Sequence, residues 1–366
     1  MPYKNSCKQS LGNIMKFFNI DRHISVIEDL RGTFEYLGCK IDDQTLSTSA
    51  HIMGKTLCKT DVISRENMAD IITKRLWEPF REAYKDRLAD YNGFISCYPP
   101  VHAMLYWFFE KPMILNIPIR YEHPFSNDSI SWSVFNQFLQ VAQVIPTANS
   151  IYDQKYFEHF TGRECRYAPS LCAYTKAKYT GKRGIALLYS RCSKLDYEHI
   201  VNLIPKELEY PNGYEWQNIA DCKCVVHFPY QVSTMSMFEH YTMCIPMFVP
   251  TKRYMMELYE QGHEVLREVS WNQIKGLPSK SAIPGKSEQP DPNDYENMGA
   301  VQHWLQYADY YSDWMRHVIQ FDSMEDLAGL LETTNFQKVS NSMMLHNVER
   351  MSFSLNAWNE ILKEIK

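Results

Sequence analysis

The chain has 366 residues, and at roughly 150 residues per domain this length predicts two domains, each with a sizeable core. It carries 38 lysines and arginines against 43 aspartates and glutamates, and this net charge of −5 disfavours a dedicated binder of nucleic acid or of anionic membranes. Hydrophobic residues make up 45% and charged residues 22%, which excludes a largely disordered chain.

The first half of the sequence alternates short apolar runs with stretches of helical periodicity. The predicted strands are 23–27, 39–46, 93–98 and 112–119, and the predicted helices are 28–37, 67–88 and 101–110. Fully apolar short strands separated by helices are typical of a parallel sheet that is covered on both faces. We therefore expect an α/β domain.

The same alternation begins again after a polar stretch between residues 170 and 183. The predicted strands are 184–189, 224–228 and 245–249, and the predicted helices are 197–204 and 236–243. A proline-rich loop is expected over 276–294, and the tail 323–366 is predicted to be helical with Ser323 as an N-cap. The sequence thus predicts a second α/β domain followed by C-terminal helices.

Several chemistries are disfavoured because their short motifs are absent. The sequence has no phosphate-binding P-loop, no G-x-G-x-x-G fingerprint, no H-E-x-x-H and no G-x-S-x-G. No D-x-D pair is present to hold a divalent metal with a nucleotide diphosphate, and Cys222 and Cys224 at C-x-C spacing are not a zinc signature. These two cysteines fit alternate positions on a buried strand. We expect neither a metal nor a cofactor.

The stretch from Cys224 to Pro250 carries the strongest functional signal. A buried strand ends at Phe228, a turn containing Tyr230 leads outward, Ser233 and Thr234 offer hydroxyls at the start of a helix, and Glu239 follows one to two turns later. Such a unit can hold a diphosphate on free backbone amides, while the Glu239 carboxylate accepts two hydroxyl hydrogen bonds from a ribose or a hexose. The alternative is a solvated glutamate and a simple cap.

This stretch resembles the donor-binding segment of GT-B glycosyltransferases, in which a strand, a loop with small hydroxyl residues, a helix bearing a glutamate and a proline-containing strand occur in that order. The matching positions are Pro229, Ser233, Thr234, Ser236, Glu239 and 244–249. The family usually has a glycine before the proline-containing strand, where this chain has 243–245, Met-Cys-Ile. The resemblance implies two Rossmann-like domains that face a cleft, with C-terminal helices that cross back to the first domain.

The resemblance also implies donor-binding residues after the strand 184–189. Arg191 and Lys194 are similar to the arginine and lysine that neutralise the donor diphosphate in many GT-B enzymes. Tyr214 and Trp216 are candidates for stacking on the nucleotide base, and core packing is the alternative for Trp216. On residue type alone, Arg191 and Lys194 are exposed basic side chains.

The first half should supply the acceptor site and the base. Arg120 and Glu122 follow the strand 112–119, at the end where α/β sheets open their ligand crevice, and an Arg–Glu surface ion pair is the alternative. His51 follows the strand 39–46, where a neutral imidazole could take the proton from an acceptor hydroxyl. His102 is a second candidate for this role. We predict His51 and Glu122 as catalytic residues.

The sequence therefore predicts a metal-independent glycosyltransferase that moves a sugar from a nucleotide diphosphate sugar to a hydroxyl of a glycan or other acceptor. Residues 1–175 would bind the acceptor, 176–322 the nucleotide sugar, and 323–366 would return to the first domain. A sugar-nucleotide epimerase or hydrolase and a non-catalytic sugar-binding subunit are the alternatives. Neither nucleic acid nor an integral membrane segment is expected.

Size, aromatic content and the lack of a targeting segment are similar to those of transferases from large algal viruses or bacterial polysaccharide clusters. The location expected from these features is cytoplasmic, or the host cytoplasm for a viral protein.

Overall fold

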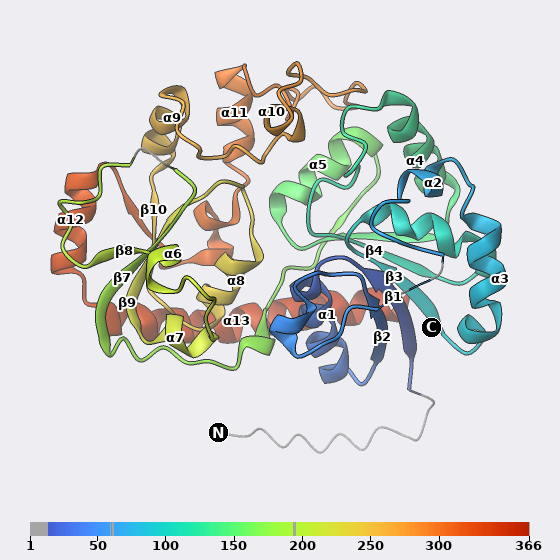
Figure 1. The fold of residues 1–366 in the computed structure, drawn as a ribbon, viewed down its shortest axis with the longest axis horizontal. Helices are drawn as coiled ribbons and strands as arrows, with labels where there is room; N and C mark the ends of the chain where they lie inside the picture. Colours follow the sequence, from blue (N-terminus) through green and yellow to red (C-terminus); the bar gives the residue numbers. More distant parts are fainter. Residues whose placement is uncertain (1–13, 59, 61, 193–194, 366) are drawn as a thin grey trace.

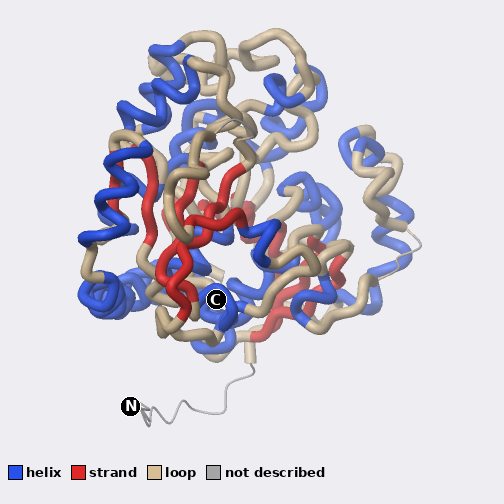
Figure 2. Tube along the Cα trace, turned by 60° about the vertical axis from the view of Figure 1, so that its left-hand side comes forward, coloured by secondary structure: helices blue, strands red, loops and turns tan. Residues whose placement is uncertain are grey.

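The chain folds into two parallel β-sheets, each flanked by helices (Figure 1). This computed structural model describes residues 14–58, 60, 62–192 and 195–365. The first sheet has six strands in the order β2-β1-β3-β4-β5-β6, and the second has five in the order β11-β10-β9-β7-β8. Figure 2 shows the strands in two groups with helices and loops around them.

The first sheet and its helices use residues 16–175. The strands are β1 (Lys16–Asp21), β2 (Lys40–Thr45), β3 (Gly93–Ser96), β4 (Met113–Ile117), β5 (Val144–Ala148) and β6 (Arg166–Tyr167). The α-helices are α1 (Ile24–Tyr36), α2 (Ala69–Ile72), α3 (Trp77–Leu88), α4 (Ser129–Val141) and α5 (Ile151–Thr161). The 3-10 helices are η1 (Ala50–Met53), η2 (Pro100–Phe109) and η3 (Ala173–Thr175).

The second sheet and the remaining helices use residues 183–363. The strands are β7 (Arg183–Ser190), β8 (Leu203–Pro205), β9 (Cys222–Phe228), β10 (Met247–Pro250) and β11 (Ile319–Phe321). The α-helices are α6 (Lys206–Glu209), α7 (Trp216–Ala220), α8 (Met235–Thr242), α9 (Lys252–Glu260), α10 (Trp271–Ile274), α11 (Met298–Leu305), α12 (Met324–Thr333) and α13 (Phe336–Lys363). Two 3-10 turns are η4 (Asp309–Tyr311) and η5 (Asp313–Met315).

The predicted fold class of two α/β halves with parallel sheets is confirmed. Every residue of β4 is buried, as expected for a strand covered on both faces. On β9, Cys222 and Cys224 are both fully buried, so the alternate-position interpretation is also correct. Ser323 caps α12 by accepting a hydrogen bond from the backbone N–H of Asp326, as the sequence predicted. The exact domain boundaries stay predictions.

Three predicted elements are wrong. Residues 24–27 belong to α1, which begins after the extended N-cap residue His23. The strand lies before this helix, in β1. The predicted helix 67–88 is divided into α2 and α3 by a turn that places Lys74 at φ 65°. The predicted helix 197–204 is instead a turn followed by β8, which pairs with β7 at the sheet edge.

The hydrophobic core does not divide between the halves as predicted. A continuous cluster of buried side chains includes Phe94 and Trp132 of the first half together with Val226 and Phe248 of the second. The two halves therefore pack on each other through apolar side chains, which stabilises one relative arrangement. Among the helices in the described ranges, none combines the length and the apolar character needed to cross a bilayer.

The C-terminal helix α13 connects both halves, as the fold prediction expected (Figure 1). Near its middle, the side-chain amide of Asn347 donates to the carbonyl of Tyr241 on α8. Near its end, Trp358 packs edge-on against Phe34 of α1, with ring centroids 5.3 Å apart. Ile361 joins the same cluster and is 1% exposed.

Shortening Ile361 to valine should lower the free energy of unfolding by about 1 kcal/mol, because one buried methyl group is lost at the contact between α13 and the first half. Urea denaturation followed by circular dichroism measures this change. Val348 on the same helix is 69% exposed, so its replacement by alanine is the matched control and should change the free energy by less than about 0.5 kcal/mol. Equal losses for the two variants would contradict the docking of the helix end.

Candidate functional site

A cleft of about 850 Å³ lies between the two halves, within the roughly 300–1,000 Å³ typical of small-molecule sites. The side chains that line it from the first half are Ser25, His51 and Ile52. From the linker between β6 and β7, residues 168–182, and from the second half come Thr175, Lys176, Ala177, Lys206, Asn212, Gly213, Tyr214, Glu215, Trp216, Gln217 and Glu239. The structure thus brings four of the predicted site residues together, namely His51, Tyr214, Trp216 and Glu239.

Glu239 on α8 is the most buried acidic group of this cleft, with 6% of the residue exposed. The hydroxyl of Tyr174 donates a hydrogen bond to its Oε1 atom, and the Trp216 side chain also hydrogen-bonds to the carboxylate. Burial raises the pKa of Glu239 above its usual range, while these two donors act in the opposite direction. The interpretation of Glu239 as a solvated helix residue is therefore wrong.

Trp216 and Tyr214 give the cleft aromatic walls. Both side chains are half-buried and pack on the apolar cluster around Leu187, and both residues also line the cleft. The Trp216 ring meets Tyr174 edge-on at a centroid distance of 5.6 Å. Trp216 therefore packs on the apolar core and also lines the cleft. A half-buried indole of this kind offers a flat surface on which a base or a sugar ring can stack.

Two lysines line the cleft, and the ammonium of one of them, Lys206, also pairs with Oε1 of the exposed Glu207 at 3.1 Å. The Lys206 ammonium lies 5.3 Å from the ring centroid of Tyr189 and 5.9 Å from that of Tyr214, and Lys176 contributes an exposed side chain from the linker. Lys206 is not among the predicted site residues, because the helix predicted over 197–204 hides that Lys206 directly follows β8. Lys206 is a basic residue directly after a strand, and the same pattern led to the prediction of Arg191.

Arg191 and Tyr230 lie together, but they do not line this cleft. The Arg191 guanidinium pairs with Glu268 and lies 3.6 Å from the ring centroid of Tyr230. These residues border a separate pocket of about 210 Å³ with Glu264 and Arg267. Lys194, the predicted partner of Arg191, falls outside the described residues.

Ser233 and Thr234 precede α8 as predicted, and neither lines the cleft. Thr234 is the N-cap residue, and its hydroxyl is within hydrogen-bonding distance of the Ser236 hydroxyl at 3.1 Å. Its side chain does not cap a backbone amide of the helix. After α8, Cys244 adopts φ 61°, a backbone conformation that favours glycine.

Arg120 is buried at the contact between the halves and is 1% exposed. Its Nη1 atom lies 3.4 Å from Oδ1 of Asp153, and its Nη2 donates to Oε1 of Gln231 at 2.5 Å. The Gln231 amide in turn donates to Oε2 of Glu268, the carboxylate that pairs with Arg191. The alternative of a surface Arg–Glu pair is therefore wrong. Arg120 belongs to a buried network that joins the halves.

The structure does not bring Glu122 and His102 to the cleft. His102 is fully buried, its Nδ1 lies 3.0 Å from the Ile20 carbonyl oxygen, and burial lowers its pKa to about 4. Glu122 is also fully buried and accepts a hydrogen bond from the Tyr156 hydroxyl at 2.9 Å. Asn293, from the loop predicted over 276–294, donates to that same hydroxyl at 2.7 Å. Glu122 thus helps to hold a second-half loop on the first half.

Burial raises the pKa of Glu122 to about 7, against an ordinary value of 4.5. Between these values the folded protein keeps a proton that the unfolded chain releases, so this group destabilises the fold as the pH rises from about 4.5 to about 7. Relative to Glu122→Gln, the wild type should lose stability over this range, by at most about 3 kcal/mol. Urea denaturation of both proteins at pH 5, 6, 7 and 8 tests this, and a difference that is constant with pH would contradict it.

A cluster of aromatic and imidazole rings at the carboxyl ends of β1, β3 and β4 was missed. The His123 ring lies between Tyr98, at a centroid distance of 5.6 Å, and Trp271 of the second half, at 4.7 Å. His23 meets Tyr98 edge-on at 5.7 Å. Burial lowers the pKa values of both histidines, so both are neutral near pH 7. For His23 and Tyr98 the signal available in the sequence was a position two residues after the end of a strand, whereas Trp271 begins α10 and follows no strand.

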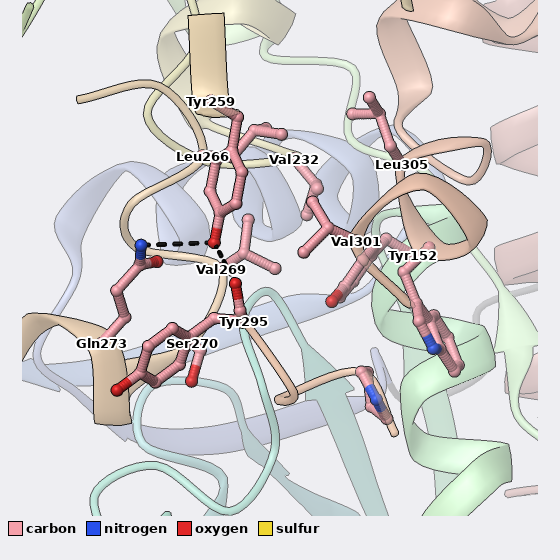
Figure 3. Close-up of a pocket in the computed structure, with 12 residues that line it drawn as sticks. Tyr152, Val232, Tyr259, Leu266, Val269, Ser270, Gln273, Tyr295, Val301 and Leu305 are labelled. Atoms are coloured by element: carbon pink, nitrogen blue, oxygen red, sulfur yellow. Dashed lines mark hydrogen bonds between the residues drawn. The ribbon is translucent and has the colours of Figure 1, made fainter. Parts of the chain in front are cut away.

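A smaller cavity lies where the segment between α9 and α11 meets α5 (Figure 3). Its walls include Tyr152, Val232, Tyr259 and Trp304, and the Gln273 amide donates to the Tyr259 hydroxyl at 3.3 Å. Its volume of about 20 Å³ admits about one water molecule. The large cleft is therefore the better candidate for a substrate site.

Comparison with known proteins gives structural neighbours only. SnogD, a glycosyltransferase from Streptomyces nogalater, is 9% identical with a TM-score of 0.48, over 96% of this chain and 99% of that one. Spinosyn rhamnosyltransferase SpnG complexed with thymidine diphosphate is 9% identical with a TM-score of 0.42, over 92% and 96%. Sucrose-phosphate synthase from Thermosynechococcus elongatus is 12% identical with a TM-score of 0.43, over 93% and 99%.

No protein-family profile and no curated sequence matches the chain. At these identities and TM-scores, the function has to be inferred from the chemistry of the cleft.

Proposed function

We propose that the protein is a glycosyltransferase that moves a sugar from a nucleotide diphosphate sugar to a hydroxyl group of an acceptor. The observation that carries this proposal is the cleft between the halves. The second half contributes the buried Glu239 carboxylate together with Trp216 and Tyr214, and the first half contributes His51. A hydroxyl-binding acceptor, flat apolar surfaces and a general base are the groups that such a transfer requires.

The second half supplies the donor side of the cleft. An ionised carboxylate has about four lone-pair sites, and Tyr174 and Trp216 use two of those of Glu239, which leaves two for hydroxyl groups of a ribose or a hexose. The ring of Trp216 stacks on the base. Lys206 and Lys176 oppose the negative charge that grows on the diphosphate as it leaves. Positive charge from lysine makes the proposed reaction independent of a metal ion.

The first half supplies the acceptor side. The Nδ1 atom of His51 lies 3.3 Å from the carbonyl oxygen of Thr48, so a proton on Nδ1 leaves Nε2 as a base in the exposed mouth of the cleft. Nε2 takes the proton of the acceptor hydroxyl, whose oxygen bonds to the anomeric carbon of the sugar. The bond from that carbon to the diphosphate breaks, and the nucleoside diphosphate leaves with the electron pair. A glycan presents such hydroxyl groups and is the proposed acceptor. The cytoplasmic location remains a prediction.

The test is a turnover assay with UDP-, GDP- and dTDP-sugars, in which release of the nucleoside diphosphate is followed with and without a panel of hydroxyl acceptors. We expect release that depends on an acceptor, together with a glycoside product detected by mass spectrometry. Release that ignores the acceptor would favour a hydrolase or epimerase. The absence of both release and binding across the panel would contradict the proposal.

A further inference from the structure

The linker between the halves is held in one conformation by three helices. On α1, the Asp29 carboxylate accepts hydrogen bonds from the backbone N–H groups of Leu171, at 3.1 Å, and Cys172, at 2.6 Å. On α8, the hydroxyl of Thr242 donates to the carbonyl of Leu171. The bonds from α13 run from Arg350 to the Ser170 carbonyl at 3.3 Å and from Ser354 to the Pro169 carbonyl at 2.8 Å.

Tyr174 follows directly in this linker, on η3, and its hydroxyl donates to Oε1 of Glu239 in the cleft. Its ring also contacts Trp216, which is the other hydrogen-bonding partner of the same carboxylate. The terminal torsion of a glutamate side chain is soft and has no single preferred angle. Two donors from different parts of the chain are therefore what holds the Glu239 carboxylate in one orientation.

We propose that Tyr174 is a positioning residue for the nucleotide-sugar site, because its hydroxyl couples the linker between the halves to the orientation of the Glu239 carboxylate. This inference rests on the proposed function of Glu239 as the group that binds sugar hydroxyls. Tyr174 does not line the cleft, whereas the next three residues of the linker do. It acts on a bound sugar through Glu239.

The same hydrogen bond favours the ionised form of Glu239, because a donor stabilises a carboxylate more than a carboxylic acid. Removal of the Tyr174 hydroxyl should therefore raise the pKa of Glu239 further. Other charged or ionisable groups act on this carboxylate or share the cleft with it. They are Asp29 on α1, His51 on η1, Cys172 and Lys176 of the linker, Tyr189 on β7, Lys206 on α6, and Tyr214 and Glu215 before α7. All of them remain in the variant.

The first test is Tyr174→Phe in the full-length protein without ligand, with glutamate side chains labelled with carbon-13 at Cδ. The Glu239 carboxyl signal is identified by its loss in Glu239→Gln. We expect its titration midpoint to rise by about one pH unit in Tyr174→Phe. The matched control is Tyr179→Phe, which removes a hydroxyl bonded to the Lys223 carbonyl at 2.9 Å, outside the cleft, and should leave the midpoint unchanged. An unchanged midpoint in Tyr174→Phe would overturn the inference.

The second test uses whichever UDP-, GDP- or dTDP-sugar the wild type turns over. In Tyr174→Phe we expect KM for this sugar nucleotide to rise about tenfold, and the acidic limb of the pH profile to move to higher pH. A KM and a pH profile equal to those of Tyr179→Phe would overturn the positioning role. The NMR titration needs no nucleotide, so failure of the wild type to use any sugar nucleotide would count against the proposed function and would be separable from the Tyr174–Glu239 result.

Discussion

Replacing Glu239 with alanine is expected to lower turnover of the nucleotide sugar by orders of magnitude while the protein stays folded. The variant loses the acceptor for two hydroxyl hydrogen bonds, each worth about 1.5–3 kcal/mol to a charged group, so the rate should fall about 10²–10⁴-fold. The Tyr174 hydroxyl and the Trp216 indole lose a buried partner, which should lower the free energy of unfolding by about 1–3 kcal/mol. Release of nucleoside diphosphate and thermal unfolding are the two measurements.

Glu257 on α9 is a suitable control for this variant, because its carboxylate is exposed and pairs with Arg253 at 2.9 Å on the surface. Glu257→Ala should retain wild-type turnover and a nearly unchanged unfolding midpoint. Glu239→Gln keeps one acceptor oxygen and should fall between the wild type and Glu239→Ala. Full activity in Glu239→Ala would remove Glu239 from the site and contradict the donor assignment.

Replacing His51 with alanine is expected to lower the transfer rate about 10²–10⁴-fold, which is the usual contribution of a positioned general base. Binding of the nucleoside diphosphate should change little, because His51 lies on the first-half wall of the cleft. The side chain is exposed on η1, so the unfolding midpoint should stay close to that of the wild type. Transfer rates at saturating donor and calorimetric binding of the nucleotide separate these two effects.

His199 provides the comparison, since it is a half-exposed histidine of the second half that lies 3.5 Å from Asp196 and away from the cleft. His199→Ala should behave as the wild type in both measurements. A His51→Ala variant with an unchanged transfer rate would show that another group takes the acceptor proton. An equal fall in nucleotide affinity would instead place His51 on the donor side.

The fold class could be predicted because the central strands are short, apolar and bounded by turn signals. Strands β4, β9 and β10 have this pattern, since the layers of a parallel sheet bury both faces of each strand. Strand β8 has only three residues and lies at the sheet edge, where pairing with β7 rather than local periodicity decides its structure. The shared core could not be predicted either, because sequence patterns mark apolar faces without telling which half they meet.

The candidate site was predictable where a residue type and its position in a strand–helix unit pointed to the same chemistry. His51 shortly after a predicted strand and Glu239 on the helix after a strand are such residues, and both line the cleft. Arg120 and Arg191 had suitable positions as well, but nearby carboxylates neutralise both, and no local pattern reveals a partner that is distant in sequence. Tyr174 could not be predicted from the sequence, because its contact with Glu239 depends on the path of the linker between the halves.

Hydrogen–deuterium exchange with a bound nucleoside diphosphate tests the central claim most directly, since that claim places the nucleotide sugar between the halves against Trp216 and Glu239. The tightest ligand among UDP, GDP and dTDP should slow exchange in 206–217 and 235–242, with a smaller effect in 47–54 across the cleft. Protection confined to 264–274, beside Arg191, or spread evenly over the chain would contradict the account.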